Sequence, residues 1–309
     1  MIVLLSGGTG GAKLARGLLD VLGEGQLAVV ANTGDDIAAF GVHVSPDPDL
    51  VTYWLAGIID EEQGYGIDGD TYETFDQLVR LGAPDWFRLG DRDLAACLIR
   101  TELLHEGSRL TEIAHYLADA LGVGAAVLPM SDEPVQTHVR TLGEWRHFQE
   151  YLIRQRCEPE IEGVEFAGAD RARPSGEVLR ALEAADAVLI GPSNPIASIG
   201  PILAVPGMME ALRELDAPVV AVSPLVAGRS LKGPTEPFMR WAGLEVSDAG
   251  IAKHYAGLID GLVVDRGTPV GRPSMAGIVV RETETLMGDA DGRARLAREA
   301  LEFATSLAG

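Results

Sequence analysis

Short apolar runs rich in β-branched residues recur along the chain, and helical patterns lie between several of them. Runs of this length and composition fit strands that are buried on both faces of a parallel sheet. The helical patterns include residues 14–22, 178–185 and 208–215. Because strands alternate with helices, the pattern predicts βαβ units. The expected strands are residues 2–5, 27–31, 125–128, 187–190, 218–222, 262–264 and 278–280.

Residues 70–122 interrupt this alternation. The segments "TYETFDQLVRLG", "DRDLAACLIRTELL" and "LTEIAHYLADALG" have helical spacing, and no strand pattern separates them. We therefore expect one α/β domain over residues 1–309, Rossmann-like, with a mostly parallel sheet and helices on both faces. Residues 70–122 would form a helical insertion at the carboxyl edge. Within residues 141–180, "EWRHFQEYLI" has helical spacing and "RCEPEIEGVEFAG" is extended in character, and their order in the fold stays open.

Polar or small-residue turns follow most of the expected strands. They are "SGGTGG", "NTGDD", "PMSDEP", "GPSNP", "SPLVAGRSLKG" and "VDRG", in chain order. Because the carboxyl ends of parallel strands share one edge, these turns should converge where α/β proteins bind ligands. The alternative is that glycine and serine turns only connect elements.

Composition narrows the range of functions. The chain of 309 residues is 47% hydrophobic with a mean hydropathy of +0.12, which is enough for a sizeable core. Its apolar runs fall short of the roughly 18 residues of a membrane span, and no secretory signal is recognisable. The two cysteines, Cys97 and Cys157, form no metal or redox pattern, so we expect a reducing cytoplasm.

Charge points to small anions rather than to polyanions. The net charge of −21 argues against binding to nucleic acid or to an anionic membrane. Two of the three lysines, Lys13 and Lys232, lie in glycine-rich turns, "GGAK" and "AGRSLKG". Scarce lysines beside glycines suggest anion binding. The alternative is that arginine has replaced surface lysine generally and that these are remnants.

The opening turn "SGGTGGAK" has the layout of a phosphate site between a strand and a helix. Glycines let the backbone approach an anion, and a helix N-terminus offers free N–H groups. It is not a P-loop, because Ala12 separates the last glycine from Lys13. Lys13 also occupies the third glycine position of the dinucleotide fingerprint, so a nicotinamide dehydrogenase fits poorly.

The segments "NTGDD" and "HVSPDPDL" supply Asp35, Asp36, Asp47 and Asp49. Carboxylates beside a phosphate site repel the ligand unless a hard cation lies between them, and Mg²⁺ binds through carboxylates and phosphate oxygens. The sequence therefore predicts a Mg²⁺ site. The alternative is ordinary turn chemistry, which aspartate favours.

Two further segments allow either a binding or a structural role. In "PDWFRLGDRD", Arg88 would bind a planar ligand beside Trp86 and Phe87, or those aromatics are core and Asp91 caps the helix that follows. In "GPSNPIASIGPIL", Ser193 and Asn194 would bind a ligand or cap a helix.

No Ser-His-Asp or Cys-His set is evident, and no nucleophile pairs with His43 or His254. Catalysis by positioning and charge is therefore favoured over covalent catalysis.

Taken together, the segments resemble the 2-phospho-L-lactate transferases of coenzyme F420 biosynthesis. The resemblance extends from residue 1 to about residue 290, with motifs in order. They are "GGTGGAKLARGL", "NTGDD", "HVSPDPDLVTYWLAG", "DWFRLGDRDLA", "PMSDEPVQT", "GPSNPIASIGPIL" and "SPLVAGRSLKGPT". It implies transfer of a phospho-acid group from a guanosine diphosphate-linked donor to 7,8-didemethyl-8-hydroxy-5-deazariboflavin, a deazaflavin alcohol. GMP would leave and Mg²⁺ would be required.

The resemblance places the metal at Asp35 and Asp49 and the deazaflavin at Asp49 and Arg88. To this we add the glycine loop and Lys13 for the diphosphate, Ser193 and Asn194 for the guanosine side, and two further anion contacts. The loop residues are Gly7, Gly8, Thr9, Gly10 and Gly11, and the added contacts are Arg229 and Lys232. Asp49 is a candidate base only where the metal does not fully occupy it.

The donor's acid stays open among lactate, enolpyruvate and glycerate, with the arginine-rich composition slightly favouring enolpyruvate. The resemblance also implies a homodimer. The alternative function is a UDP-sugar-binding regulator of the same superfamily, which would share the glycine loop and "NTGDD" but not the deazaflavin segments.

Overall fold

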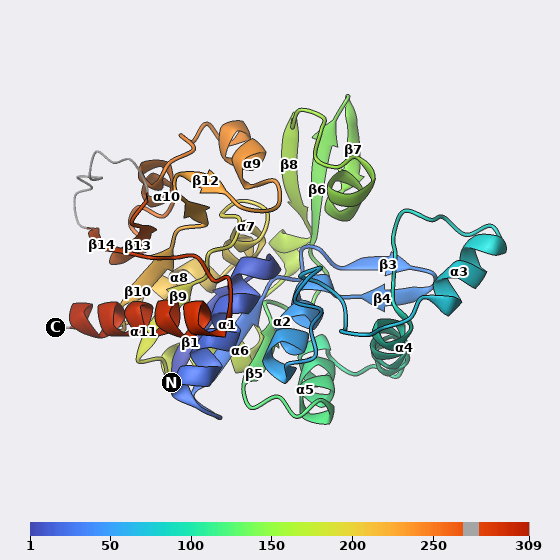
Figure 1. Cartoon of the computed structure of the whole chain (residues 1–309), viewed down its shortest axis with the longest axis horizontal. Coiled ribbons are helices and arrows are strands. Elements are labelled where there is room, and N and C mark those ends of the chain that lie inside the picture. The colour runs from blue at the N-terminus through green and yellow to red at the C-terminus, as the bar shows by residue number, and fades with distance from the viewer. Residues whose placement is uncertain (268–277, 309) are drawn as a thin grey trace.

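The computed structural model describes residues 1–267 and 278–308. Seven strands form its central sheet, and these are the seven that the apolar runs predicted. In chain order they are β1 (Ile2–Ser6), β2 (Leu27–Ala31), β5 (Ala126–Pro129), β9 (Ala187–Ile190), β10 (Val219–Val222), β13 (Gly261–Asp265) and β14 (Val279–Thr283). Every neighbouring pair is parallel, so the predicted Rossmann-like α/β class is confirmed (Figure 1).

The central strands bury side chains on both faces. In β1, Ile2 and Leu4 belong to one hydrophobic cluster, whereas Val3 and Leu5 belong to the other. Successive side chains of a strand point to opposite faces, so a continuous apolar run supplies both cores at once. This is the reason that these strands read as uninterrupted apolar runs rather than as alternating patterns.

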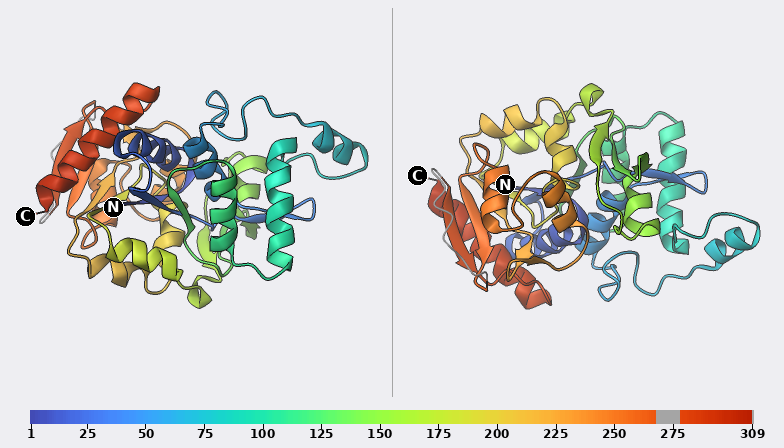
Figure 2. Two further views of the ribbon diagram at one scale, coloured as in Figure 1. Left: turned by 90° about the horizontal axis from the view of Figure 1, so that it is seen from below. Right: turned by 90° about the horizontal axis from the view of Figure 1, so that it is seen from above.

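Helices cover both faces of the sheet, as predicted (Figure 2). On one face lie α1 (Gly8–Leu22), α2 (Pro46–Ala56) and α11 (Ala290–Leu307), with α1 packed against both of the others. The opposite face is covered by α6 (Gly176–Glu183), α7 (Ile199–Ala204), α8 (Met208–Arg213) and α10 (Asp248–His254).

The strand order places a switch point beside β1. The order across the sheet is β14-β13-β10-β9-β1-β2-β5, so the chain moves from β1 towards one edge and later returns to β9 on its other side. A crevice opens outside the carboxyl ends of the strands where the order reverses, and ligands bind there in open α/β sheets. The turns after β1 and β9 carry the glycine loop and the segment "GPSNP".

Smaller elements are added around this sheet. Residues 70–122 contain α3 (Glu73–Arg80), α4 (Asp91–His105) and α5 (Leu110–Ala120). A hairpin of β3 (Ile37–Ala39) and β4 (Val42–Val44) packs against α4, and a second hairpin pairs β11 (Leu225–Val226) with β12 (Arg229–Ser230). Figure 1 shows α3, α4 and the first hairpin projecting together from one side of the sheet. Helix α9 (Thr235–Trp241) follows the second hairpin.

The segment 141–180 corrects one expectation. "EWRHFQEYLI" does not form a single helix, because β7 (Glu144–His147) precedes a short helical turn at Glu150–Arg154. Strand β7 pairs with β6 (Gln136–Thr141), which also pairs with β8 (Gly163–Ala167) in a three-stranded antiparallel sheet. The extended character of "RCEPEIEGVEFAG" corresponds to β8. Trp145 and Arg146 alternate in a strand supported by cross-strand pairing, which single-segment helical spacing does not reveal.

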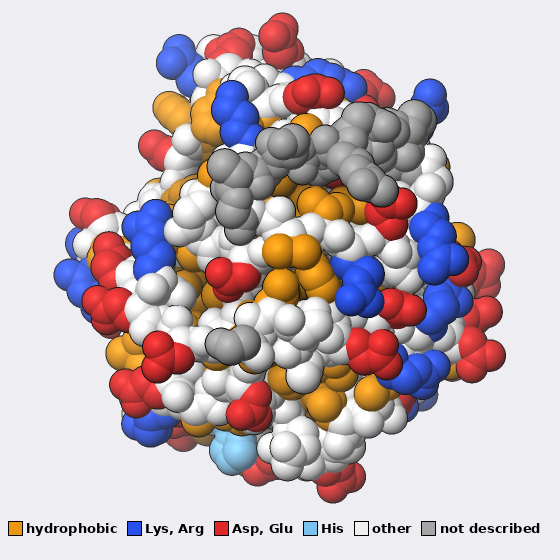
Figure 3. All heavy atoms as spheres, turned by 90° about the vertical axis from the view of Figure 1, so that its left-hand side faces the viewer, with side chains coloured by type: hydrophobic (Ala, Val, Ile, Leu, Met, Phe, Trp, Pro, Cys, Tyr) orange, Lys and Arg blue, Asp and Glu red, His pale blue; other side chains and the backbone are white. Residues whose placement is uncertain are grey.

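Charges of both signs are mixed on the surface. On the face in Figure 3, Lys and Arg side chains are interspersed with Asp and Glu around apolar groups. Within the described residues, none of the helices has both the length and the apolar composition for crossing a membrane.

Close packing of α1 on α11 gives a test of the fold. A Cβ on Gly17 would lie 2.4 Å from the carbonyl oxygen of Arg293, so Gly17→Ala should separate the two helices. Overpacking costs roughly 1–3 kcal/mol, which outweighs the gain of up to about 1 kcal/mol from alanine in a helix. We expect a net loss of about 1–2 kcal/mol in the free energy of unfolding, measured by urea titration. Gly288→Ala, where nothing lies within 4 Å of the new Cβ, is the matched control. Equal stabilities of the two variants would contradict this packing.

Candidate functional site

The site begins where the glycine loop meets the turn after β9 and the first turn of α2. The backbone N–H of Gly7 donates to Ser193 Oγ (3.3 Å) and that of Gly8 donates to Asp47 Oδ1 (2.7 Å). Ser193 follows β9, and Asp47 lies in the first turn of α2. Segments far apart in sequence are thus joined at the carboxyl edge, as the strand order requires.

Packing requires most of the glycines in this loop. A Cβ on Gly10 would lie 2.1 Å from the carbonyl oxygen of Pro192, and one on Gly11 would lie 2.3 Å from Ser6 Oγ. A Cβ on Gly7 would meet Ser198 Cβ at 2.6 Å. Only Gly8 adopts a left-handed backbone, at φ +67°. The glycines therefore seat α1 against the neighbouring turns, and this seating fixes where the helix N-terminus points.

The N-terminus of α1 keeps donors for an anion. The first N–H groups of a helix have no acceptor within the helix. Side chains satisfy those of Gly7 and Gly8, which leaves Thr9 and Gly10 as the next donors. Lys13 follows on the same helix, where its Nζ donates to the carbonyl of Met287 (3.3 Å).

Positive charge gathers around this end of α1. Burial, then Lys232 and Arg293, lower the pKa of Lys13, so the three cations lie within Coulombic range of one another. Lys232 Nζ is 3.3 Å from the position of a Cβ on Gly64, and Thr9 Oγ1 donates to the Gly64 carbonyl (3.4 Å). The structure thus brings Lys13 and Lys232 together, as the sequence suggested. Arg229 is exposed on the β11–β12 hairpin.

Asn32 connects two of the aspartates. Its amide Nδ2 donates to Asp47 Oδ2 (2.8 Å) and to Asp35 Oδ1 (3.2 Å), while its Oδ1 accepts from the Gly34 N–H (2.8 Å). Burial and the neighbouring Asp47 raise the pKa of Asp35 well above its usual range. Burial also raises the pKa of Asp47 to about 6, despite hydrogen bonds from Asn32 and Gly8. Asp47, which carried no assigned role, therefore joins the glycine loop to Asp35 through one amide.

The Asp36 side chain forms a second set of polar contacts in the site. Its carboxylate accepts from Ser45 Oγ (2.8 Å) and contacts His43 Nε2 (2.9 Å). Its charge raises the pKa of both Asp35 and Asp49, although burial is the larger cause for each. Asp35 and Asp49 thus share one electrostatic cluster, with Asp36 in range of both.

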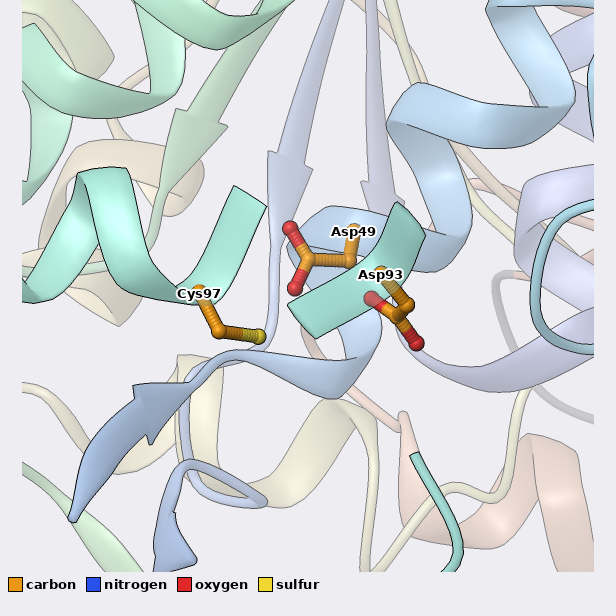
Figure 4. A group of neighbouring side chains, drawn as sticks. All are labelled: Asp49, Asp93 and Cys97. Atoms are coloured by element: carbon orange, nitrogen blue, oxygen red, sulfur yellow. The ribbon is translucent and has the colours of Figure 1, made fainter. Parts of the chain in front are cut away.

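Asp49 lies in a group with Asp93 and Cys97, shown in Figure 4, in which Asp49 and Cys97 are buried and Asp93 is half-buried. Within the described residues, one ligand atom from each of the three lies within 4.8 Å of the others. The Arg100 side chain contacts two members of this group. Its guanidinium forms an ion pair with Asp49 Oδ1, and its Nη1 lies 3.7 Å from Cys97 Sγ. A protein cation therefore already compensates Asp49 on this side.

The environment of that group favours the protonated forms of its other two members. Burial, then the Asp49 charge, raise the pKa of Asp93 to about 7, and Tyr53 OH donates to it (2.8 Å). Burial likewise raises the pKa of the Cys97 thiol. The second oxygen of Asp49, Oδ2, is buried and has no hydrogen-bond partner among the described residues. This atom is the open acceptor of the cluster.

Arg88 is held on a loop braced by two helix caps. Asp70 accepts from the Arg92 N–H (2.9 Å) at the start of α4, while Asp91 accepts from the Thr74 N–H (3.0 Å) at the start of α3. The alternative in which Asp91 caps the following helix is therefore wrong, because its carboxylate caps α3 instead. Hydrogen bonds, led by that from Thr71, lower the pKa of Asp91 to about 2.

The Arg88 side chain is exposed and stacks on an aromatic ring. Its guanidinium carbon lies 3.6 Å from the centre of the Tyr72 ring, a partner that the sequence analysis missed. Phe87 and Leu89 on either side are buried in a small core with Val42 and Val44. Phe87 is thus core, as the structural alternative held, while Arg88 stays available at the surface.

Ser193 and Asn194 take structural bonds and keep one free donor. Asn194 Oδ1 accepts from the N–H groups of Ile196 (3.0 Å) and Ala197 (3.1 Å), which is the capping alternative. Its Nδ2 is buried without a hydrogen-bond partner in the described residues. That donor remains available to a ligand at the switch point.

Comparison with known proteins identifies the family. A family model described as "2-phospho-L-lactate transferase CofD" matches residues 2–302. The chain belongs to the CofD family. A relative from Streptomyces griseus called "Phosphoenolpyruvate transferase" is 42% identical over 311 residues, covering 98% of each chain. A relative from Methanosarcina mazei called "2-phospho-L-lactate transferase" is 41% identical over 264 residues, covering 85% of this chain and 86% of that one.

Among solved structures, the fold matches a UPF0052 family protein from Bacillus halodurans. The TM-score is 0.62 at 18% sequence identity, covering 97% of this chain and 98% of the other. At this identity the likeness supports the fold only. The resemblance to the transferase family is confirmed by the family model and the two relatives, and this CofD-type chain is accordingly a transferase.

The crowded carboxylates predict how Asp35 affects stability. Its raised pKa means that the folded state holds the proton more tightly than the unfolded state. Stability from this group is therefore greatest at low pH and falls as the pH rises from 3.8 through the folded-state pKa. Asp35→Asn keeps the acceptor for Asn32 and removes the charge. In EDTA at pH 8 we expect the variant to be more stable than the parent by on the order of 1–2 kcal/mol, and no more stable near pH 4.

Urea unfolding at both pH values measures this difference. The control is Asp20→Asn, which changes a partly exposed aspartate paired with Arg16. An Asp35→Asn protein that is less stable than the parent at pH 8 would contradict the charge crowding.

Proposed function

We propose that this CofD-family chain transfers a phospho-acid group, with phosphoenolpyruvyl as the first choice, in coenzyme F420 biosynthesis. The donor would be linked to guanosine diphosphate, the acceptor would be 7,8-didemethyl-8-hydroxy-5-deazariboflavin, and GMP would leave. The observation that carries the proposal is the hydrogen-bonded connection from the α1 N-terminus to the buried carboxylates: the Gly8 N–H donates to Asp47, and Asn32 joins Asp47 to Asp35. Family membership supports the reaction class.

The choice of enolpyruvate rests on coverage rather than on identity. Relatives called "Phosphoenolpyruvate transferase" align with 98% of this chain, whereas those called "2-phospho-L-lactate transferase" align with 85% at similar identity. Phospholactyl and phosphoglyceryl donors are tested together with the phosphoenolpyruvyl donor.

The residues suit a divalent cation. Asp49 Oδ2 is a buried oxygen without a partner, and Asp35 carries a buried carboxylate beside Asp36 and Asp47. Oxygen donors near a phosphate site are the ligands that Mg²⁺ takes. Asp35 and Asp49 would hold the ion, while Asp47 is already bonded through both oxygens. The ion would supply positive charge to the pyrophosphate and let the carboxylates stay ionised beside it.

The other groups divide between donor and acceptor. The N–H groups of Thr9 and Gly10, with Lys13 and Lys232, would bind the diphosphate. Ser193 and the free Nδ2 of Asn194 would lie on the guanosine side, with Arg229 as a further anion contact. Arg88, stacked on Tyr72, would present a flat cation to the deazaflavin rings, beside Asp49.

The reaction then needs alignment more than a strong nucleophile. The acceptor's hydroxyl oxygen attacks the donor phosphorus that carries the acid, and the bond from that phosphorus to the bridging oxygen of GMP breaks. Backbone donors and cations oppose the charge that builds up on the phosphate oxygens. A homodimer would be the working unit, as the resemblance implies.

The decisive assay offers the acceptor and each of the three guanylylated donors to the purified protein with Mg²⁺. We expect GMP and a phosphodiester product, fastest with the enolpyruvyl donor, and loss of both products in EDTA. Chromatography of the products measures this. Binding of UDP-N-acetylglucosamine, with no GMP from any donor, would instead support the regulator and contradict the transferase.

Arg88→Ala should weaken the acceptor's binding selectively. Loss of a stacked cation on the order of 1–2 kcal/mol corresponds to a roughly tenfold rise in the acceptor's KM, with the donor's KM unchanged. Steady-state kinetics with each substrate varied in turn measures the split. Arg80→Ala, at the exposed end of α3, is the matched control. An unchanged acceptor KM in Arg88→Ala would remove Arg88 from the acceptor site.

A further inference from the structure

His43 has one bonded and one open ring nitrogen. It lies on β4, and its Nε2 contacts Asp36 Oδ2 at 2.9 Å. A carboxylate accepts only, so the neutral ring carries its proton on Nε2 and presents a lone pair on Nδ1. Among the residues that the structure describes, none bonds Nδ1, and 31% of the side chain is exposed.

The surroundings hold this ring in place. The backbone N–H of His43 donates to Thr101 Oγ1 (2.7 Å), and its backbone carbonyl accepts from Arg100 Nη1 (3.2 Å). Thr101 and Arg100 both lie on α4. Ser45 Oγ fixes the other oxygen of Asp36 at 2.8 Å. The imidazole is therefore oriented through a carboxylate that is itself oriented, which is the arrangement that makes a histidine an efficient base.

The His43 ring faces the carboxylate cluster of the site. Val42 and Val44, its neighbours in β4, pack in the small core with Phe87 and Leu89, and because successive side chains alternate, the His43 ring points to the other face of the strand. The charges that face the ring are Asp36, from the turn before β3, and Asp49, from α2, whose pKa His43 lowers. Arg100 approaches the backbone of His43 from α4.

The nearby His147 shows what a purely structural histidine looks like here. Its Nε2 donates to the Asp36 carbonyl (3.0 Å) and its Nδ1 accepts from the Gln149 N–H (3.1 Å). Both nitrogens are used, which fixes the neutral tautomer and ties β7 to the "NTGDD" turn. His43 differs in keeping one nitrogen open.

We infer that His43 is the catalytic base that takes the proton from the acceptor's hydroxyl, and that Asp36 is its positioning residue. This inference rests on the proposed function. As the hydroxyl oxygen bonds to the donor phosphorus, its proton moves to His43 Nδ1 and the bond from phosphorus to the GMP oxygen breaks. The imidazolium, stabilised by Asp36, then returns the proton to water through its exposed edge.

The structure also makes Asp49 a poorer base. Arg100 pairs with its Oδ1, and the remaining Oδ2 is the atom that suits the cation. A carboxylate held between two positive charges has little tendency to take a proton. His43 has no such competition at Nδ1.

Two variants test the inference. In His43→Gln the side-chain amide can still donate to Asp36 but offers no base, and in His43→Ala the ring site is empty. We expect kcat to fall about 10²- to 10⁴-fold in both, with each KM and the Mg²⁺ concentration for half-maximal activity within about threefold of the parent. Added imidazole should restore part of the kcat of His43→Ala. The control is His115→Gln, which changes an exposed side chain on α5.

The outcomes separate the two proposals. A parent enzyme that releases GMP together with a His43→Gln protein of near-parental kcat overturns the role of His43 and leaves the transferase standing. A structural role alone would also predict that imidazole fails to rescue His43→Ala while glutamine succeeds. A parent that releases no GMP from any donor overturns the proposed function itself, and with it this inference.

Discussion

The structure depends on how four buried carboxylates share one edge of the sheet. Asp35, Asp36, Asp47 and Asp49 are each at least nine-tenths buried, and burying ionised carboxylates near one another is costly. Hydrogen-bond donors and cations offset part of this cost. They are the Asn32 amide, the Gly8 N–H, Ser45, His43 and Arg100. The raised pKa values of Asp35, Asp47 and Asp49 indicate that the compensation is incomplete.

That edge exists because of close backbone packing. Gly10 and Gly11 let α1 approach the turn after β9, and Gly17 lets α11 approach α1. The helix N-terminus is thereby fixed at the point where the strand order reverses. The same contact gives Asp47 its role, because α2 must lie beside α1 for its carboxylate to reach the Gly8 N–H. The contacts that pack α1 against its neighbours therefore also position the side chains of the site.

Two histidines near the site differ in how many of their ring nitrogens are hydrogen-bonded. His147 has both nitrogens bonded and joins the three-stranded sheet to the "NTGDD" turn that follows β2. His43 has one nitrogen on Asp36 and one without a hydrogen-bond partner among the described residues. In the sequence both are single histidines in short strands without a distinguishing pattern. Their difference arises from which element each ring faces after folding.

The sequence by itself determined the seven strands, the α/β class, the helices of residues 70–122 and the family, because buried strands and glycine turns leave local patterns. It also picked out Asp35, Asp49, Lys13 and Arg88 as site residues, and these remain proposals. It did not reveal the β6–β8 sheet, the crossed caps of Asp70 and Asp91, or the pairing of Arg100 with Asp49 and of Asp36 with His43. Only the tertiary structure decided these, since each joins residues from separate elements whose meeting depends on packing and not on spacing along the chain.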